Sequence, residues 1–133
     1  MALKLDRDDF EDIGFVKTCF IADIINICEL KDWIYLVIEK QDEVPFYLFK
    51  MLELKSKRDF KPLDIIGYVP FWMHTDAEYD ALLGVGYLRS GDFWSDKVSR
   101  HKALERLNNN MHIRARFYEM FPFLKEKDGV TDI

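Results

Sequence analysis

The sequence has no apolar run that approaches the roughly 20 residues needed by a membrane-spanning helix. Its nearest candidate, residues 15–30, is interrupted by Lys17, Asp23 and Glu29. The N-terminal residues are acidic and lack the basic and apolar regions of a signal peptide. We therefore expect a soluble, cytoplasmic protein that does not associate with membranes.

Cysteine is scarce, with Cys19 and Cys28 as the only two. If both lie on one helix, a rise of about 1.5 Å per residue separates them by about 13 Å along the axis. A disulfide requires Cα atoms closer than about 7 Å. We therefore expect two free thiols, buried as small hydrophobic side chains in a reducing compartment.

Catalytic and cofactor signatures are missing as well. The chain contains no Walker A lysine, no zinc-ligand spacing, no HExxH pair and no GxSxG nucleophile elbow. Gly84 and Gly86 lack a third glycine at the spacing of a dinucleotide-binding loop, so tight helix packing explains these small residues better. We expect no cofactor and no metal, and we favour a non-enzymatic protein over an enzyme.

The composition is that of a folded domain. Hydrophobic residues make up 49% of the 133 residues and charged residues 32%, which is typical of globular proteins at a common size for one domain. We expect residues 1–124 to form a single globular domain. Residues 125–133 are polar, and we expect them to form a C-terminal tail that frays.

Apolar spacing and capping residues predict a mainly α fold of five or six helices. Residues 16–30 place apolar side chains at helical spacing. Thr75 with Glu78 three residues later is a capping box, which predicts a helix over 76–88. Further helices are expected from Ser95 or Asp96 onward and over 111–124, although residues 111–117 also alternate as a strand would. Residues near 60–74, with Gly67 among them, are expected to form an irregular, aromatic-rich connector.

The region 33–50 leaves an alternative open. Residues 33–38 read WIYLVI, and a short apolar run of this kind occurs in buried strands and in buried helices alike. A β-hairpin that pairs 33–39 with 44–50 would make the fold α+β. We favour helices, because residues 46–57 are rich in good helix formers.

Charge is distributed unevenly along the second half of the chain. The net charge is −5, which disfavours a nucleic-acid binder driven by bulk charge. Residues 75–96 contain five acidic residues and one arginine, whereas residues 97–116 contain six basic residues and one glutamate. A phosphate or nucleic-acid contact through 97–116 therefore stays open as an alternative function.

The stretch 68–94 combines aromatic and acidic residues. Tryptophan and tyrosine are enriched at the energetic centres of protein interfaces, and acids beside them suit a basic partner. We therefore expect a module that binds another protein, with a homodimer as a further option. An immunity-type protein that neutralises a basic toxin is one form of this hypothesis, and it rests on size and charge alone. The candidate contact residues are Trp72, Asp76, Glu78, Tyr79, Asp80, Asp92 and Trp94.

The rival hypothesis is a small enzyme that uses His74 with Asp76, Glu78 and Asp80. The alternating spacing of these side chains looks metal-like, but a metal ion needs several ligands that converge on one point. On a helix that begins at Thr75, Glu78 would point away from the face shared by the other two acids. We therefore interpret the acids as first-turn charges that favour the helix N-terminus.

Overall fold

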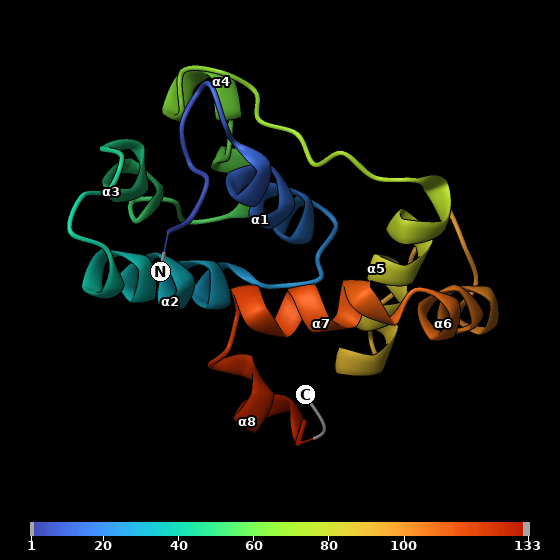
Figure 1. Cartoon of the computed structure of the whole chain (residues 1–133). Coiled ribbons are helices and arrows are strands. Elements are labelled where there is room, and N and C mark those ends of the chain that lie inside the picture. Colours follow the sequence, from blue (N-terminus) through green and yellow to red (C-terminus); the bar gives the residue numbers. More distant parts are fainter. Residues whose placement is uncertain (1, 132–133) are drawn as a thin grey trace. The chain divides into compact units, whose positions relative to one another are not determined.

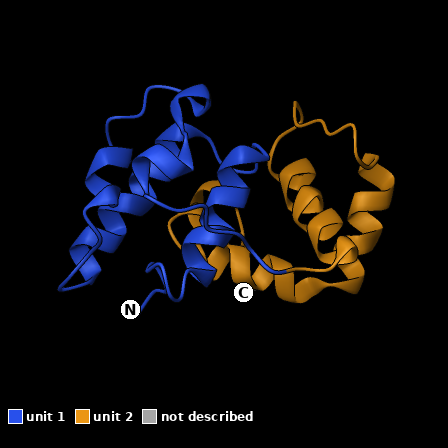
Figure 2. Ribbon diagram, turned by 90° about the horizontal axis from the view of Figure 1, so that it is seen from above, with its two compact units in different colours: residues 1–73 blue, residues 74–133 orange. Residues whose placement is uncertain are grey.

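The computed structural model describes residues 2–131 and builds them from helices (Figure 1). Within these residues the β-type pairing consists of one isolated bridge between Asp6 and Asp9. The chain divides into two compact units, residues 1–73 and 74–133 (Figure 2). The predicted mainly α class is therefore confirmed, while the single globular domain over 1–124 stays a prediction.

Five helices of ten or more residues contain most of the helical residues of the described chain, and they are accompanied by three short α-helices and one 3₁₀ turn. The long helices are α1 (Glu11–Ile21), α2 (Ile27–Lys40), α5 (Asp76–Arg89), α6 (Arg100–Asn109) and α7 (Met111–Met120). The short ones are α3 (Tyr47–Met51), α4 (Pro62–Ile65) and α8 (Leu124–Asp128), with the 3₁₀ turn η1 at Lys57–Asp59.

The alternative hairpin over 33–50 does not form. Residues 33–39 lie inside α2, and residues 47–50 lie inside α3. Trp33, Ile34 and Val37 are completely buried, and this spacing places all three on one helical face. The helix favoured over residues 46–57 is shorter than that range, because α3 ends at Met51.

The helix predicted over 16–30 is in fact two helices. Helix α1 ends before Asp23, which has φ 64°, and Asn26 caps α2 through a capping box with Glu29. Cys19 and Cys28 consequently lie on different helices. Both are free thiols as expected, but Cys28 is exposed, so the prediction that both are buried is wrong for this residue.

In the first unit the aromatic connector packs against α1. A Cβ atom placed on Gly14 would lie only 2.2 Å from the Phe71 carbonyl oxygen, so the absence of a side chain lets the connector approach the helix. The Lys17 ammonium donates to the Pro70 carbonyl at 2.8 Å, and the ring of Trp72 meets that of Phe15 edge to face at 5.1 Å. The irregular connector predicted near 60–74 is present, with α4 as a single helical turn inside it.

In the second unit α5 packs against α6 and α7. A Cβ atom on Gly84 would lie 2.7 Å from the Ala103 carbonyl oxygen, so glycine permits the close approach of α6, as predicted from the small residues of α5. Helix α6 begins at Arg100 with Ser99 as its cap. The start expected at Ser95 or Asp96 is therefore wrong, because residues 90–98 form an irregular segment.

The C-terminal residues differ from the expected tail. Leu124 is buried and begins α8, and Asp128 is held by an ion pair with Arg89. Gly129, with φ 71°, ends the helix in the left-handed conformation that glycine adopts readily. Residues 132 and 133 of the expected tail lie outside the described residues. None of the helices in residues 2–131 combines the length and apolar character required to cross a membrane.

Candidate functional site

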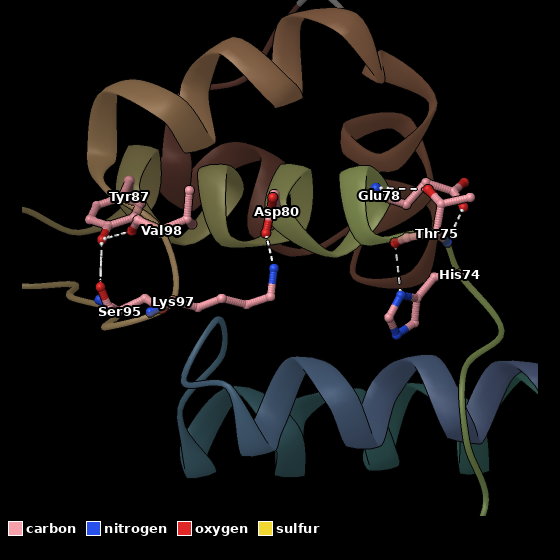
Figure 3. Close-up of polar contacts among 8 residues, drawn as sticks. All are labelled: His74, Thr75, Glu78, Asp80, Tyr87, Ser95, Lys97 and Val98. Carbon is pink, nitrogen blue, oxygen red and sulfur yellow. Dashed lines mark hydrogen bonds and ion pairs between the residues drawn. The ribbon is translucent and has the colours of Figure 1, made fainter.

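The N-terminus of α5 is built by the capping box that the sequence predicts (Figure 3). The Glu78 backbone N–H donates to the Thr75 hydroxyl at 3.1 Å, and the Thr75 N–H donates to the Glu78 carboxylate at 2.9 Å. Asp76 is exposed in the first turn, where the helix dipole favours an acidic side chain. Glu78 therefore has a structural role, whereas Asp76 faces solvent.

Glu78 is also tied to α7. The His112 imidazole donates through Nε2 to the second Glu78 oxygen at 2.7 Å. The hydrogen bond from the Thr75 backbone and the one from His112 hold the pKa of Glu78 below its usual value, because both favour the charged carboxylate. This carboxylate is consequently engaged on both oxygens and joins two helices of the second unit.

Asp80 and Tyr79 gather around Lys97. Asp80 is buried and accepts a hydrogen bond from the Lys97 ammonium (Figure 3). The same ammonium lies 5.4 Å from the centre of the Tyr79 ring. A cation over an aromatic face is attracted by the ring quadrupole. Asp80, one of the predicted contact residues, is therefore turned inward and holds Lys97. Tyr79, another of them, is half-buried beneath the Lys97 ammonium.

Tyr87 holds the segment 90–98 against α5. Its hydroxyl donates to the Val98 carbonyl at 2.8 Å and accepts from the Ser95 N–H at 3.1 Å (Figure 3). The Arg100 guanidinium donates to the Tyr87 carbonyl at 2.8 Å, and the Phe93 ring packs edge-on to the Tyr87 ring at 4.8 Å. The segment is therefore fixed to the helix although it has no regular secondary structure of its own.

Trp94 projects from this fixed segment. Its exposed fraction is 75%, and the acidic residues Asp92 and Asp96 on either side of it are exposed as well. The Asp92 N–H donates to the Ser90 hydroxyl at 3.2 Å, which orders the turn that precedes the tryptophan. A large apolar side chain between two carboxylates is thus presented to solvent on an ordered stretch of chain.

Trp72 does not belong to this surface. It is only 5% exposed and lies in the first unit, where it packs against Phe15. Its assignment as a partner-binding residue stays a prediction, and its burial counts against it, because a core tryptophan reaches a partner only if the unit opens. Of the seven predicted contact residues, Asp76, Asp92 and Trp94 are exposed, Glu78 and Tyr79 are half-buried, and Trp72 and Asp80 are buried.

The His74 cluster of the enzyme hypothesis is dispersed. The His74 Nδ1–H donates to the Thr75 carbonyl at 2.9 Å, and its ring lies 5.3 Å from the Tyr79 ring. Glu78 and Asp80 are turned toward His112 and Lys97. Across the described chain, three or more His, Cys, Asp or Glu side chains do not gather at any point suited to a metal ion.

The basic stretch 97–116 is partly used inside the second unit. Lys97 binds Asp80, Arg100 binds the Tyr87 carbonyl, and the Arg114 guanidinium lies 5.9 Å from the centre of the Tyr118 ring. Lys102 is exposed. The stretch therefore does not present all of its charge on one face as a nucleic-acid footprint would.

Sequence reasoning missed Lys97 and Tyr87 as the residues that position the site. The i, i+4 rule for helical charge pairs has no bearing on Asp80 and Lys97, which are 17 residues apart. A helix that started at Asp96 would have placed Lys97 in its first turn, so the wrong helix boundary concealed the pair. Comparison of the chain with protein-family models, curated proteins and solved structures gave no match.

Proposed function

We propose that this chain is a non-enzymatic module that binds a basic protein through the segment 90–98. The observation that carries the proposal is Trp94, which is 75% exposed on a segment held in place by the Tyr87 hydroxyl. Trp94 inserts into an apolar pocket of the partner, and Asp92 and Asp96 face its basic residues.

The exposed surface of Trp94 is large enough to anchor an interface. Roughly 200 Å² of an exposed tryptophan, at about 25 cal/mol per Å², corresponds to about 5 kcal/mol when it is fully buried. The freedom of motion that both molecules lose on association reduces this gain. A segment that is already ordered before binding loses less freedom, so the reduction is smaller. The hydrogen bonds that the Tyr87 hydroxyl accepts from the Ser95 N–H and donates to the Val98 carbonyl therefore support the anchoring role of Trp94.

Charge supports a basic partner. The chain carries a net charge of −5, and Asp92 and Asp96 are exposed beside the anchor. Complementary charge accelerates association and suppresses wrong partners, and salt screens it. An immunity-type protein that neutralises a basic toxin is the particular form of this proposal that small size and acidic charge favour.

The test is a pull-down from the source cell, with neighbouring genes expressed, at low and at high salt. Wild-type protein is compared with Trp94→Ala and with Tyr35→Ala, a control that removes an exposed aromatic residue from the first unit. We expect a basic partner that is retained by wild type and by the control, released by salt, and lost with Trp94→Ala. Equal capture by Trp94→Ala contradicts the proposal.

A second copy of the chain would also bury Trp94, and light scattering separates this outcome. The proposal predicts that the wild-type protein alone is a monomer at micromolar concentration and forms a complex only with its partner. A dimer that becomes a monomer on Trp94→Ala would instead assign the surface to self-association and overturn the choice of a basic partner.

A further inference from the structure

An exposed apolar strip, residues 69–73, lies at the end of the first unit. Residues 66–73 follow α4 without helical structure (Figure 1). Val69 and Phe71 are each 54% exposed and Met73 is 76% exposed, whereas the residues between them are buried. A period of two is that of an extended chain with one covered face. The uncovered face of the strip is therefore apolar.

The strip is held in place on the first unit. The ammonium of the half-buried Lys17 donates to the Pro70 carbonyl at 2.8 Å. The Arg7 guanidinium donates to the Gly67 carbonyl at 2.7 Å, and it lies over the Tyr68 ring at 5.4 Å. A surface that is ordered before binding loses less freedom when a partner docks on it.

A turn at residues 6–9 lies next to the strip. Its two ends are joined by a pair of backbone hydrogen bonds of 3.1 Å. Phe10, directly after the turn, places its ring 5.0 Å from the Phe71 ring and 5.9 Å from the Tyr68 ring. Because Arg7 also binds the connector, the turn is attached to it on both sides.

The turn is acidic. Asp6, Asp8 and Asp9 are all exposed, and within the described chain none of the three carboxylates forms an ion pair. Arg7 is the one cation of the turn, so its formal charge is 1 − 3 = −2. An apolar surface with an acidic edge suits a segment that carries both apolar and basic side chains.

The strip also offers backbone donors. In the part of the chain that the structure describes, the N–H groups of Val69 and Phe71 have no hydrogen-bond partner. Pro70 has no N–H, and the Phe71 carbonyl packs on Gly14. An extended peptide that lies along such a chain accepts hydrogen bonds from its N–H groups and places alternate side chains against it. The unpaired donors therefore favour an extended ligand.

We propose that the strip 69–73 and the turn 6–9 together bind an extended segment of a partner protein, in which apolar residues alternate with lysine or arginine. The apolar side chains of this segment cover Val69 and Phe71, and its cations face the carboxylates of the turn. This surface belongs to the first unit and does not rest on the function proposed for segment 90–98.

The probe is a short synthetic peptide that alternates valine with lysine, titrated into the full chain and followed by amide NMR. One reference peptide alternates serine with lysine and keeps only the charge. The other alternates valine with glutamate and reverses the charge. We expect saturable shifts at residues 7–10 and 67–73 with the probe and much weaker binding of both references. The affinity should fall as sodium chloride is added, because salt screens exposed charges.

Val69→Ser tests the apolar part of the surface, and Tyr35→Ser is its control. Both variants remove an exposed apolar side chain from the first unit, but only Val69 belongs to the strip. Covering the exposed half of a valine side chain is worth about fivefold in affinity. We expect Val69→Ser to weaken binding of the probe by about fivefold and Tyr35→Ser to leave it unchanged.

Asp8→Asn combined with Asp9→Asn tests the acidic part of the surface. Its control combines Asp42→Asn with Glu43→Gln, which removes two exposed carboxylates from elsewhere in the first unit. Exposed ion pairs are worth little individually, so we expect the first double variant to weaken binding by about threefold at low salt. The control should bind as wild type does. Spectra of the unliganded variants show whether each fold is retained.

Three results would overturn the proposal: equal binding of either reference peptide, equal loss in the control variants, and shifts that map to segment 90–98 instead of the strip. Spectra of the protein alone at rising concentration test a second copy as the occupant. Shifts at residues 69–73 without peptide would assign the strip to self-association and would also overturn the proposal. None of these results bears on Trp94.

Discussion

Replacing Tyr87 with phenylalanine tests whether one hydroxyl group holds the Trp94 segment. The substitution keeps the aromatic ring, so the contact with Phe93 at 4.8 Å is retained. It removes the acceptor of the Ser95 N–H, at 3.1 Å, and the donor to the Val98 carbonyl, at 2.8 Å. Two backbone groups thus lose their partner in a single step.

The two losses differ in size. The hydrogen bond to the Val98 carbonyl is buried, and a buried acceptor left without a donor costs about 1–3 kcal/mol. The Ser95 N–H is only partly buried, so water can replace its partner at little cost. We therefore expect Tyr87→Phe to lower the free energy of unfolding by about 1–3 kcal/mol.

Urea denaturation measures this change, and amide hydrogen exchange locates it. We expect the Ser95 amide to exchange about tenfold faster or more in Tyr87→Phe, because lowering the free energy of local opening by about 1.4 kcal/mol raises the exchange rate tenfold. Tyr79→Phe is the control on the same helix. Within the described chain the Tyr79 hydroxyl makes no hydrogen bond, so stability should change by less than about 0.5 kcal/mol.

An unchanged midpoint with unchanged Ser95 exchange would refute the reasoning. The Tyr87 hydroxyl would then contribute nothing to the order of segment 90–98. The ordering that supports Trp94 as an anchor would have to come from Lys97 and Arg100 instead. Tyr87→Phe should also weaken partner capture, although residue 87 is itself buried.

Three further substitutions test the rest of the structure. Gly14→Ala should lower the free energy of unfolding, measured by urea denaturation, by about 1–3 kcal/mol, because the new methyl group collides with the Phe71 carbonyl. This loss is expected although alanine has a better helix propensity than glycine. Gly91→Ala is the control and should not destabilise the protein, because its methyl group would lie in open space. Trp72→Ala should cost about 3–5 kcal/mol by the same assay, and a surface-like loss below about 1 kcal/mol would contradict its burial. Glu78 has a lowered pKa in the folded protein, so its stabilisation is present above the unfolded value of about 4.3 and disappears as pH falls through the folded pKa. Glu78→Gln should therefore lose less stability than wild type between neutral and acidic pH, and parallel curves would argue against this linkage.

Local signals in the sequence were sufficient for some of the helices. The start of α5 follows from Thr75 and Glu78, because a capping box is formed by residues only three positions apart. Asn26 and Glu29 have the same spacing and the same chemistry, so they indicate the start of α2 in the same way. The long apolar pattern over 16–30 obscured this second signal. The positive φ of Asp23, which separates the two helices, could not be predicted from the sequence.

The site depended on contacts that no local pattern contains. Trp72 and Trp94 are both tryptophans of one aromatic stretch, so the sequence pattern does not distinguish them. One packs on Phe15, and the other is exposed, a difference that depends on the tertiary structure alone. Likewise, Asp80 lies in the same acidic pattern as Asp76, but its burial next to Lys97 depends on where segment 90–98 returns to α5.

The two thiols of the first unit can be used to measure how often this unit opens. Cys28 is exposed at the start of α2, whereas Cys19 is buried in α1. A thiol reagent should modify Cys28 at once and reach Cys19 only when α1 separates from its surroundings. Because residues 74–133 contain no cysteine, the second modification times the opening of residues 1–73 alone. Intact-mass spectrometry would then follow the opening of the first unit without any contribution from the second.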